Sequence, residues 1–117
     1  MAKDNSFHNH IMEDVLGQFP GMTSRPMFGG WGIYRNGWFF ALIDNNQLYF
    51  KVDDSTRADY EAVGSHQFTY TKQGKSMPMA YWLLPESVIE DKELLRQFVD
   101  KAVAVAKKGK AAKVVHR

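Results

Sequence analysis

The chain has 117 residues, of which 44% are hydrophobic and 14% aromatic, and its formal net charge is +2. A chain of this length and composition can bury a core without disulfides or a metal, so we expect a folded domain rather than disorder. The absence of cysteine excludes a disulfide framework, a thiolate zinc site and a cysteine nucleophile.

Charge is distributed unevenly along the chain, since residues 101–117 contain six Lys or Arg residues and no acid. We predict one domain over residues 1–117, with an ordered core at about residues 7–107 and a basic tail at residues 108–117. The polar N-terminus lacks the apolar region of a secretory signal, and no apolar run approaches the roughly 18 residues that span a bilayer. A cytoplasmic protein without a membrane partner is therefore expected.

The first predicted element is a helix over residues 7–16, where apolar residues recur at helical spacing. Ser6 is its expected N-cap, and Gly17 follows its last residue. The Phe19-Pro20-Gly21 segment then ends the helix.

Three short strands are predicted next, at residues 32–35, 38–43 and 47–52. Asn36-Gly37 is typical of a type I′ hairpin turn, because both central residues of that turn need positive φ. Asp44-Asn45-Asn46 supplies the second turn.

The strand at residues 38–43 is apolar on both predicted faces. This pattern indicates a central strand, covered by helices on one side and by a partner or a packed loop on the other. Alternation predicts two sets of residues on opposite faces: Trp38, Phe40 and Leu42, and Phe39, Ala41 and Ile43. In the next strand it places Leu48, Phe50 and Val52 inside, and Gln47, Tyr49 and Lys51 outside.

A helix is predicted from Asp53 to about Val63, with acids at its positive end. Strands at residues 67–71 and 76–84 follow, and Pro78 indicates an open edge because proline cannot donate to a ladder. Pro85 begins a short helical turn, and Asp91 begins the longest helix, whose apolar stripe should lie on the sheet. That stripe comprises Leu94, Leu95, Phe98, Val99, Ala102, Val103 and Ala106. The order α-βββ-α-ββ-α predicts an α+β fold with a single antiparallel five-stranded sheet.

No grouping of residues indicates catalysis, a cofactor or a metal. Gly29-Gly30-Trp31-Gly32 leads into a strand rather than a helix, which favours structural glycines over a phosphate-binding loop. The histidines lack metal-ligand spacing, and the acidic pairs precede helices, where capping accounts for them. We therefore predict a protein that is not an enzyme.

Two features favour nucleic acid as an alternative partner. Tyr34, Tyr49, Tyr70 and Tyr81, with Lys51 and Arg35, could form a sheet face that stacks bases, or else a protein-binding face. The basic tail attracts phosphate, and its candidate contacts are Lys107, Lys108, Lys110, Lys113 and Arg117.

Several short segments carry a family resemblance: RPMFGG at residues 25–30, GIY at 32–34, FALI at 40–43, LYFKVD at 48–53, TR at 56–57, FTY at 68–70, and residues 79–85 around Tyr81. Their order and spacing resemble the N-terminal domain of the TfoX/Sxy family over about residues 10–106. The signature residues, which we interpret as structural, are Pro26, Met27, Phe28, Gly29, Gly30, Gly32, Tyr34 and Lys51.

The resemblance implies a compact α+β domain, similar to the secretion-chaperone arrangement, that tends to pair as dimers. The best-known members are two-domain regulators of natural competence that act with the cyclic-AMP receptor protein on promoters. Because this chain ends at Arg117, we expect a stand-alone N-terminal domain. The resulting hypothesis is a non-enzymatic regulatory or adaptor domain that forms a homodimer and contacts a protein of the transcription machinery. The alternative is a nucleic-acid-binding accessory protein.

Overall fold

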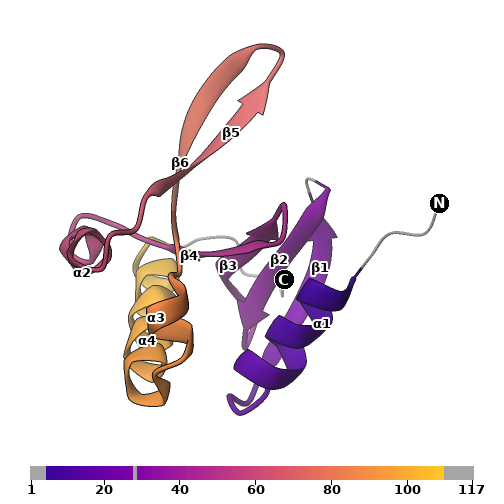
Figure 1. Ribbon diagram of the computed structural model, residues 1–117, viewed down its shortest axis with the longest axis vertical. Coiled ribbons are helices and arrows are strands. Elements are labelled where there is room, and N and C mark those ends of the chain that lie inside the picture. The colour runs from indigo at the N-terminus through magenta and orange to yellow at the C-terminus, as the bar shows by residue number, and fades with distance from the viewer. Residues whose placement is uncertain (1–4, 28, 110–117) are drawn as a thin grey trace.

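The computed structural model describes residues 5–27 and 29–109. In this part of the chain, one antiparallel sheet of six strands carries helices on one face (Figure 1). The helices are α1 (Ser6–His10), the π-helix η1 (Ile11–Val15), α2 (Arg57–Ala62), α3 (Glu86–Ile89) and α4 (Lys92–Lys108). The strands are β1 (Met22–Met27), β2 (Gly30–Arg35), β3 (Trp38–Asp44), β4 (Gln47–Lys51), β5 (Gln67–Lys72) and β6 (Lys75–Leu83). Their order across the sheet is β1-β2-β3-β4-β6-β5.

The predicted α+β class and antiparallel sheet are confirmed, but the prediction of five strands is wrong. The additional strand is β1, which pairs with β2 from Met22↔Arg35 to Met27↔Gly30. It is an edge strand with three exposed and three half-buried side chains, and it contains Pro26. Since it lacks an apolar alternation and contains a proline, its sequence does not read as a strand.

The hairpin turns are confirmed by their backbone angles. Asn36 and Gly37 have φ values of 51° and 86°, and Asn45 and Asn46 have values of 52° and 58°. These left-handed conformations are the ones that a type I′ turn requires. The turn between β5 and β6 has the same character, with φ values of 53° at Gln73 and 79° at Gly74.

A β-bulge in β3 overturns the predicted assignment of its two faces. Ile33 pairs with Ala41 and Tyr34 pairs with Phe39, so Phe40 is an extra residue on β3. Such a residue interrupts the alternation of side chains along the strand. The core on the helix side therefore contains Phe40, Ala41 and Ile43, while Leu42 and Phe39 belong to a separate cluster on the other face.

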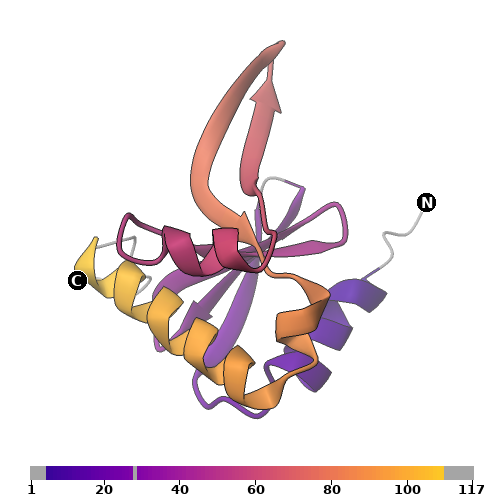
Figure 2. The same cartoon turned by 60° about the vertical axis from the view of Figure 1, so that its left-hand side comes forward.

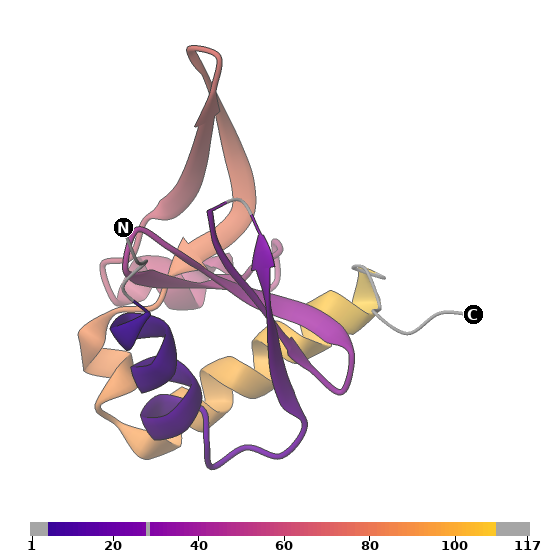
Figure 3. The same cartoon turned by 90° about the vertical axis from the view of Figure 1, so that its right-hand side faces the viewer.

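The helices and the sheet enclose the main core. Helix α4 begins at Asp91, whose side chain accepts a hydrogen bond from the Leu94 amide at 3.1 Å, as expected of an N-cap. Its predicted apolar stripe is buried except for Leu94, which is half-buried. Figures 2 and 3 show α4 and the α1–η1 helix on the same side of the sheet, with the β5–β6 hairpin rising from the other side.

The N-terminal helix occupies residues 6–15, close to the predicted range. Its second half is a π-helix, in which the Leu16 amide donates to the Ile11 carbonyl at 2.8 Å. The prediction of Ser6 as the N-cap is wrong, because Asn5 occupies the cap position. Asn5 makes no side-chain cap hydrogen bond. No helix in the described ranges is long and apolar enough to cross a membrane.

Asp53 stabilises the entrance to α2, although it is not the N-cap of that helix. Its Oδ1 accepts hydrogen bonds from the Ser55 amide at 2.9 Å and the Ser55 hydroxyl at 2.6 Å. Its Oδ2 lies 3.0 Å from the Nζ of Lys108, near the end of α4. The Ser55 hydroxyl, followed by Lys108, lowers the pKa of Asp53 to about 2.

The depressed pKa predicts a pH-dependent contribution to stability. The Asp53 carboxylate should stabilise the fold above its unfolded-state pKa of about 3.9, and this contribution should disappear as the pH falls towards about 2. The difference in unfolding free energy between the wild type and Asp53→Asn should therefore shrink over that window in urea titrations. Ser55→Ala removes the largest cause of the lowered pKa of Asp53, so it should raise the lower end of this window and narrow it, because the upper end is set by the unfolded state. A difference that is equal at pH 6 and at the bottom of the window would contradict this assignment.

Candidate interaction surface

The sheet face opposite the helices, which we call the outer face, carries its own apolar cluster. Its buried members are Leu42, Tyr49, Phe68 and Tyr81. Phe39, Tyr70, Met79 and Leu83 pack around them and are half-buried. The apolar second side of β3 is therefore covered by residues of β5 and β6, and the coverage alone does not require a partner.

A row of aromatic rings crosses the outer face, with a cation at each end. The Tyr34 and Phe39 ring centroids are 5.1 Å apart, and those of Phe39 and Tyr81 are 5.6 Å apart. The Arg25 Cζ lies 6.0 Å from the Tyr34 centroid, and the Lys51 Nζ lies 4.9 Å from the Tyr81 centroid. These five residues, which we call the aromatic row, come from strands β1, β2, β3, β6 and β4.

The two cations of the row lack a carboxylate within ion-pair distance among the described residues. Elsewhere in that part of the chain, several cations are paired: Arg35 with Asp100, Arg57 with Asp54, Lys101 with Asp59, and Lys108 with Asp53. Burial lowers the pKa of Lys51, and the charge of Asp53 partly offsets this effect. Burial also raises the pKa of Tyr81, so its hydroxyl stays neutral and can donate.

The β5–β6 hairpin projects from the outer face, and we call its residues 67–79 the arm. Strand β6 pairs with β4 only over Tyr81–Leu83, so the arm has two strands and β6 has an open edge at Pro78, as predicted. Gln67 pairs with Trp82 whereas Thr69 pairs with Pro78, so two steps along β5 match four along β6. This irregularity allows the strand to bend, and Figure 1 shows the arm leaving the sheet.

The arm is amphipathic. On its apolar side, Phe68, Tyr70 and Met79 join the outer-face cluster, and alternation puts Met77 on the same side nearer the tip. Among the large hydrophobic residues that the structure describes, Met77 is the exposed one, with 42% of its surface accessible. The opposite side of the arm carries exposed polar or small residues, which are Gln67, Thr69, Thr71, Ser76 and Pro78.

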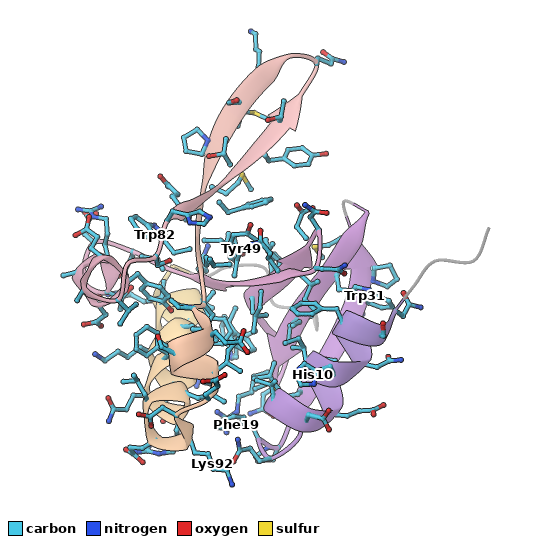
Figure 4. The ribbon with its side chains drawn as sticks, in the orientation of Figure 1. His10, Phe19, Trp31, Tyr49, Trp82 and Lys92 are labelled. Atoms are coloured by element: carbon cyan, nitrogen blue, oxygen red, sulfur yellow. The ribbon has the colours of Figure 1, made fainter. Side chains whose placement is uncertain are left out.

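The tyrosines do not form the predicted base-stacking face. Tyr34, Tyr49 and Tyr81 are only 6%, 5% and 5% exposed, and Tyr70 is half-buried. Tyr49 was expected to face outward, but its ring packs against Phe68 of the arm at a centroid distance of 4.7 Å. Figure 4 shows Tyr49 at the foot of the arm, on the side of the sheet away from Phe19 and Lys92. Alternation placed Tyr49 on the correct face but could not show that the arm covers it.

The glycines of the family signature lie in the β1–β2 hairpin, where each meets a structural constraint. Gly29 has a φ of 78°, which favours glycine in this turn. A Cβ at Gly30 would overlap the carbonyl oxygen of Ile43, and one at Gly32 would lie 2.6 Å from the Met27 Cε. Pro26 and Met27 end strand β1, whereas Phe28 lies outside the described residues.

The remaining candidate contacts are distributed elsewhere. Lys107 and Lys108 are exposed at the end of α4, and Lys108 is engaged by Asp53. Lys110, Lys113 and Arg117 lie outside the described residues. Sequence reasoning did not name Arg25, Phe39 or Met77 as candidate contact residues. Arg25 belongs to the strand that was missed, and the exposure of Met77 depends on the bend of the arm.

A hollow lies beside the glycine loop, the segment whose sequence favoured structural glycines over a phosphate-binding loop. It has a volume of about 130 Å³ and is lined by His8, Gly30, Trp31 and Asn46, among others. The His8 ring stacks on Trp31 with a centroid distance of 3.8 Å. Ligand pockets usually measure about 300–1,000 Å³, so this hollow gives little support to a ligand carrier. In the described ranges no three His, Asp or Glu residues gather as a metal site.

Comparison with known proteins connects this architecture to a family. A comparison with curated proteins gives no significant match. The family described as the TfoX N-terminal domain matches residues 14–106, which is most of the chain. The chain therefore belongs to the TfoX N-terminal domain family.

Proposed function

We propose that the protein is a non-enzymatic regulatory domain that acts by binding another protein through the outer face and the arm. Membership of the TfoX N-terminal domain family indicates a regulatory domain of the competence type. The observation that carries the protein-binding role is the arm, whose apolar side continues past the sheet to the exposed Met77. A projecting two-stranded hairpin is marginally stable by itself, so a partner that covers this side would stabilise it.

The family also suggests the kind of partner. We propose a protein of the transcription machinery, since the regulatory character of the family points to control of gene expression. Homodimerisation remains a prediction. The nucleic-acid alternative has less support, because three of its four tyrosines are buried. Of its two tail cations in the described residues, Lys107 and Lys108, the second is paired with Asp53.

Substitutions on opposite sides of the arm test this function. Met77→Asp places a charge on the apolar side, while Ser76→Asp places the same charge on the polar side one residue away. We expect immobilised wild type and Ser76→Asp to retain the same protein from native lysate, with and without nuclease. Met77→Asp should retain roughly tenfold less, because a charged group would be buried at the contact. Quantitative mass spectrometry measures the difference.

Two results would contradict the proposal. Loss of the captured protein after nuclease treatment would favour the nucleic-acid alternative, and equal capture by both variants would remove the arm from the contact. Light scattering of the wild type and both variants over a concentration series would show whether the partner is a second copy of the chain.

A further inference from the structure

We propose, on the basis of the function proposed above, that the outer face binds an acidic and apolar segment of the partner protein. In this arrangement Arg25 and Lys51 hold two carboxylates of the segment at opposite ends of the aromatic row. The apolar side chains of the segment pack against Phe39 and against Met77 and Met79 of the arm.

The charge of the outer face is the first argument. Arg25 and Lys51 lie beside aromatic rings and have no carboxylate at ion-pair distance in the described part of the chain, unlike Arg35 and Lys101 on the helix side. The rings supply hydrophobic contact and a weak cation–π attraction but no opposite charge. One carboxylate of the partner at each cation would complete the two sites, and charge complementarity of this kind gives an interface its specificity.

The spacing of the two cations defines the ligand further. Arg25 of β1 is in register with Tyr49 of β4, three interstrand spacings or roughly 14 Å across the sheet, and Lys51 lies two residues, or roughly 7 Å, further along β4. Roughly 16 Å therefore separate the backbones of Arg25 and Lys51. One carboxylate or one free phosphate ion is too small to reach both. Two carboxylates at this separation would lie about five residues apart in an extended segment, or about ten to eleven residues apart in a helix.

The apolar surroundings favour a protein segment over a nucleic acid. Base stacking needs exposed rings, whereas Tyr34 and Tyr81 of the row are buried. Met77 and Met79 offer flexible thioether side chains that adapt to apolar partners.

Zero-length carbodiimide cross-linking of the complex captured from native lysate tests the inference. This reagent joins a lysine amine directly to a carboxylate that it contacts, and mass spectrometry then identifies both residues. We expect Lys51 to be joined to an Asp or Glu within an apolar segment of the partner. Lys51→Arg keeps the positive charge without the reactive amine, so it should retain the partner and lose the cross-link.

Charge reversal provides the binding measurement. Arg25→Glu should reduce retention of the captured protein by roughly tenfold or more, because it replaces attraction by repulsion. Lys92→Glu makes the same change of charge on the helix side, where Figure 4 places Lys92 far from Tyr49, and it should leave retention unchanged. Thermal unfolding of each variant checks that its fold is intact.

The failure of this inference is distinguishable from failure of the proposed function. One outcome is that Met77→Asp abolishes capture, whereas Arg25→Glu does not and Lys51 forms no cross-link. The arm then binds a protein, but the inference that the bound segment is acidic is wrong. If cross-links join Lys51 to this chain's own acids between isotopically distinct copies, the occupant is a second copy and the inference is overturned. Capture that depends on nucleic acid would overturn both proposals.

Discussion

Replacing Phe50 by alanine should lower the free energy of unfolding by about 3–5 kcal/mol. Phe50 lies on β4, is 0% exposed, and packs edge-on against the equally buried Phe40 with ring centroids 5.3 Å apart. Truncation removes the transfer energy of the ring and leaves a cavity between the sheet and the helices. Because domains of this size are stable by only about 5–15 kcal/mol, the loss is a large fraction of the total.

Urea denaturation followed by tryptophan fluorescence measures this effect. Phe50→Leu is the conservative companion, and it should cost less than about 1.5 kcal/mol because most of the buried volume is kept. Equal costs for the two substitutions would show that the site relaxes around the cavity. Phe50 would then not be part of a tightly packed core.

The sequence was sufficient to predict the elements whose signals are local. The Asn36-Gly37 turn, the start of α4 at Asp91 and the open edge at Pro78 each depend on the chemistry of one or two residues. The apolar stripe of α4 was predictable because it repeats over several helical turns. Local chemistry and periodicity therefore account for most of the fold.

The features that sequence reasoning missed depend on contacts between distant segments. Strand β1 forms through its pairing with β2, since its own residues lack an apolar alternation and include a proline. The bulge at Phe40 arises from the register between β2 and β3, and one inserted residue is enough to exchange the faces that follow it. No periodic pattern within β3 contains that information.

The interaction surface was even less accessible from the sequence. Tyr81 was noticed as a candidate base-stacking residue, but whether it is exposed depends on how β6 bends and on what covers the outer face. Arg25 and Lys51 are 26 positions apart in the sequence and are brought to one face only by the order of the strands. Sequence composition predicted a protein without catalytic groups, and the partner site that we propose rests on the strand order and the arm rather than on a sequence pattern.

The signature glycines give the second large expected effect, through two alanine substitutions in the same strand. Gly30→Ala should destabilise the fold by about 3 kcal/mol or more, and Gly32→Ala by about 1 kcal/mol. At Gly30 the new methyl group would overlap the main-chain carbonyl oxygen of Ile43, so β2 and β3 would have to move apart. At Gly32 it would meet the Met27 Cε at 2.6 Å and the edge of Phe39 at 3.1 Å. Met27 is flexible at that end and can rotate away.

The two substitutions control for each other. Both glycines are buried in β2, and both exchanges restrict the unfolded chain by the same amount, so the difference between them isolates the native-state clash. Urea titration of both variants should give a clearly lower midpoint for Gly30→Ala. Equal midpoints would mean that the backbone of β3 yields as readily as a methionine side chain, and the glycine of the signature at position 30 would then need an explanation other than close packing.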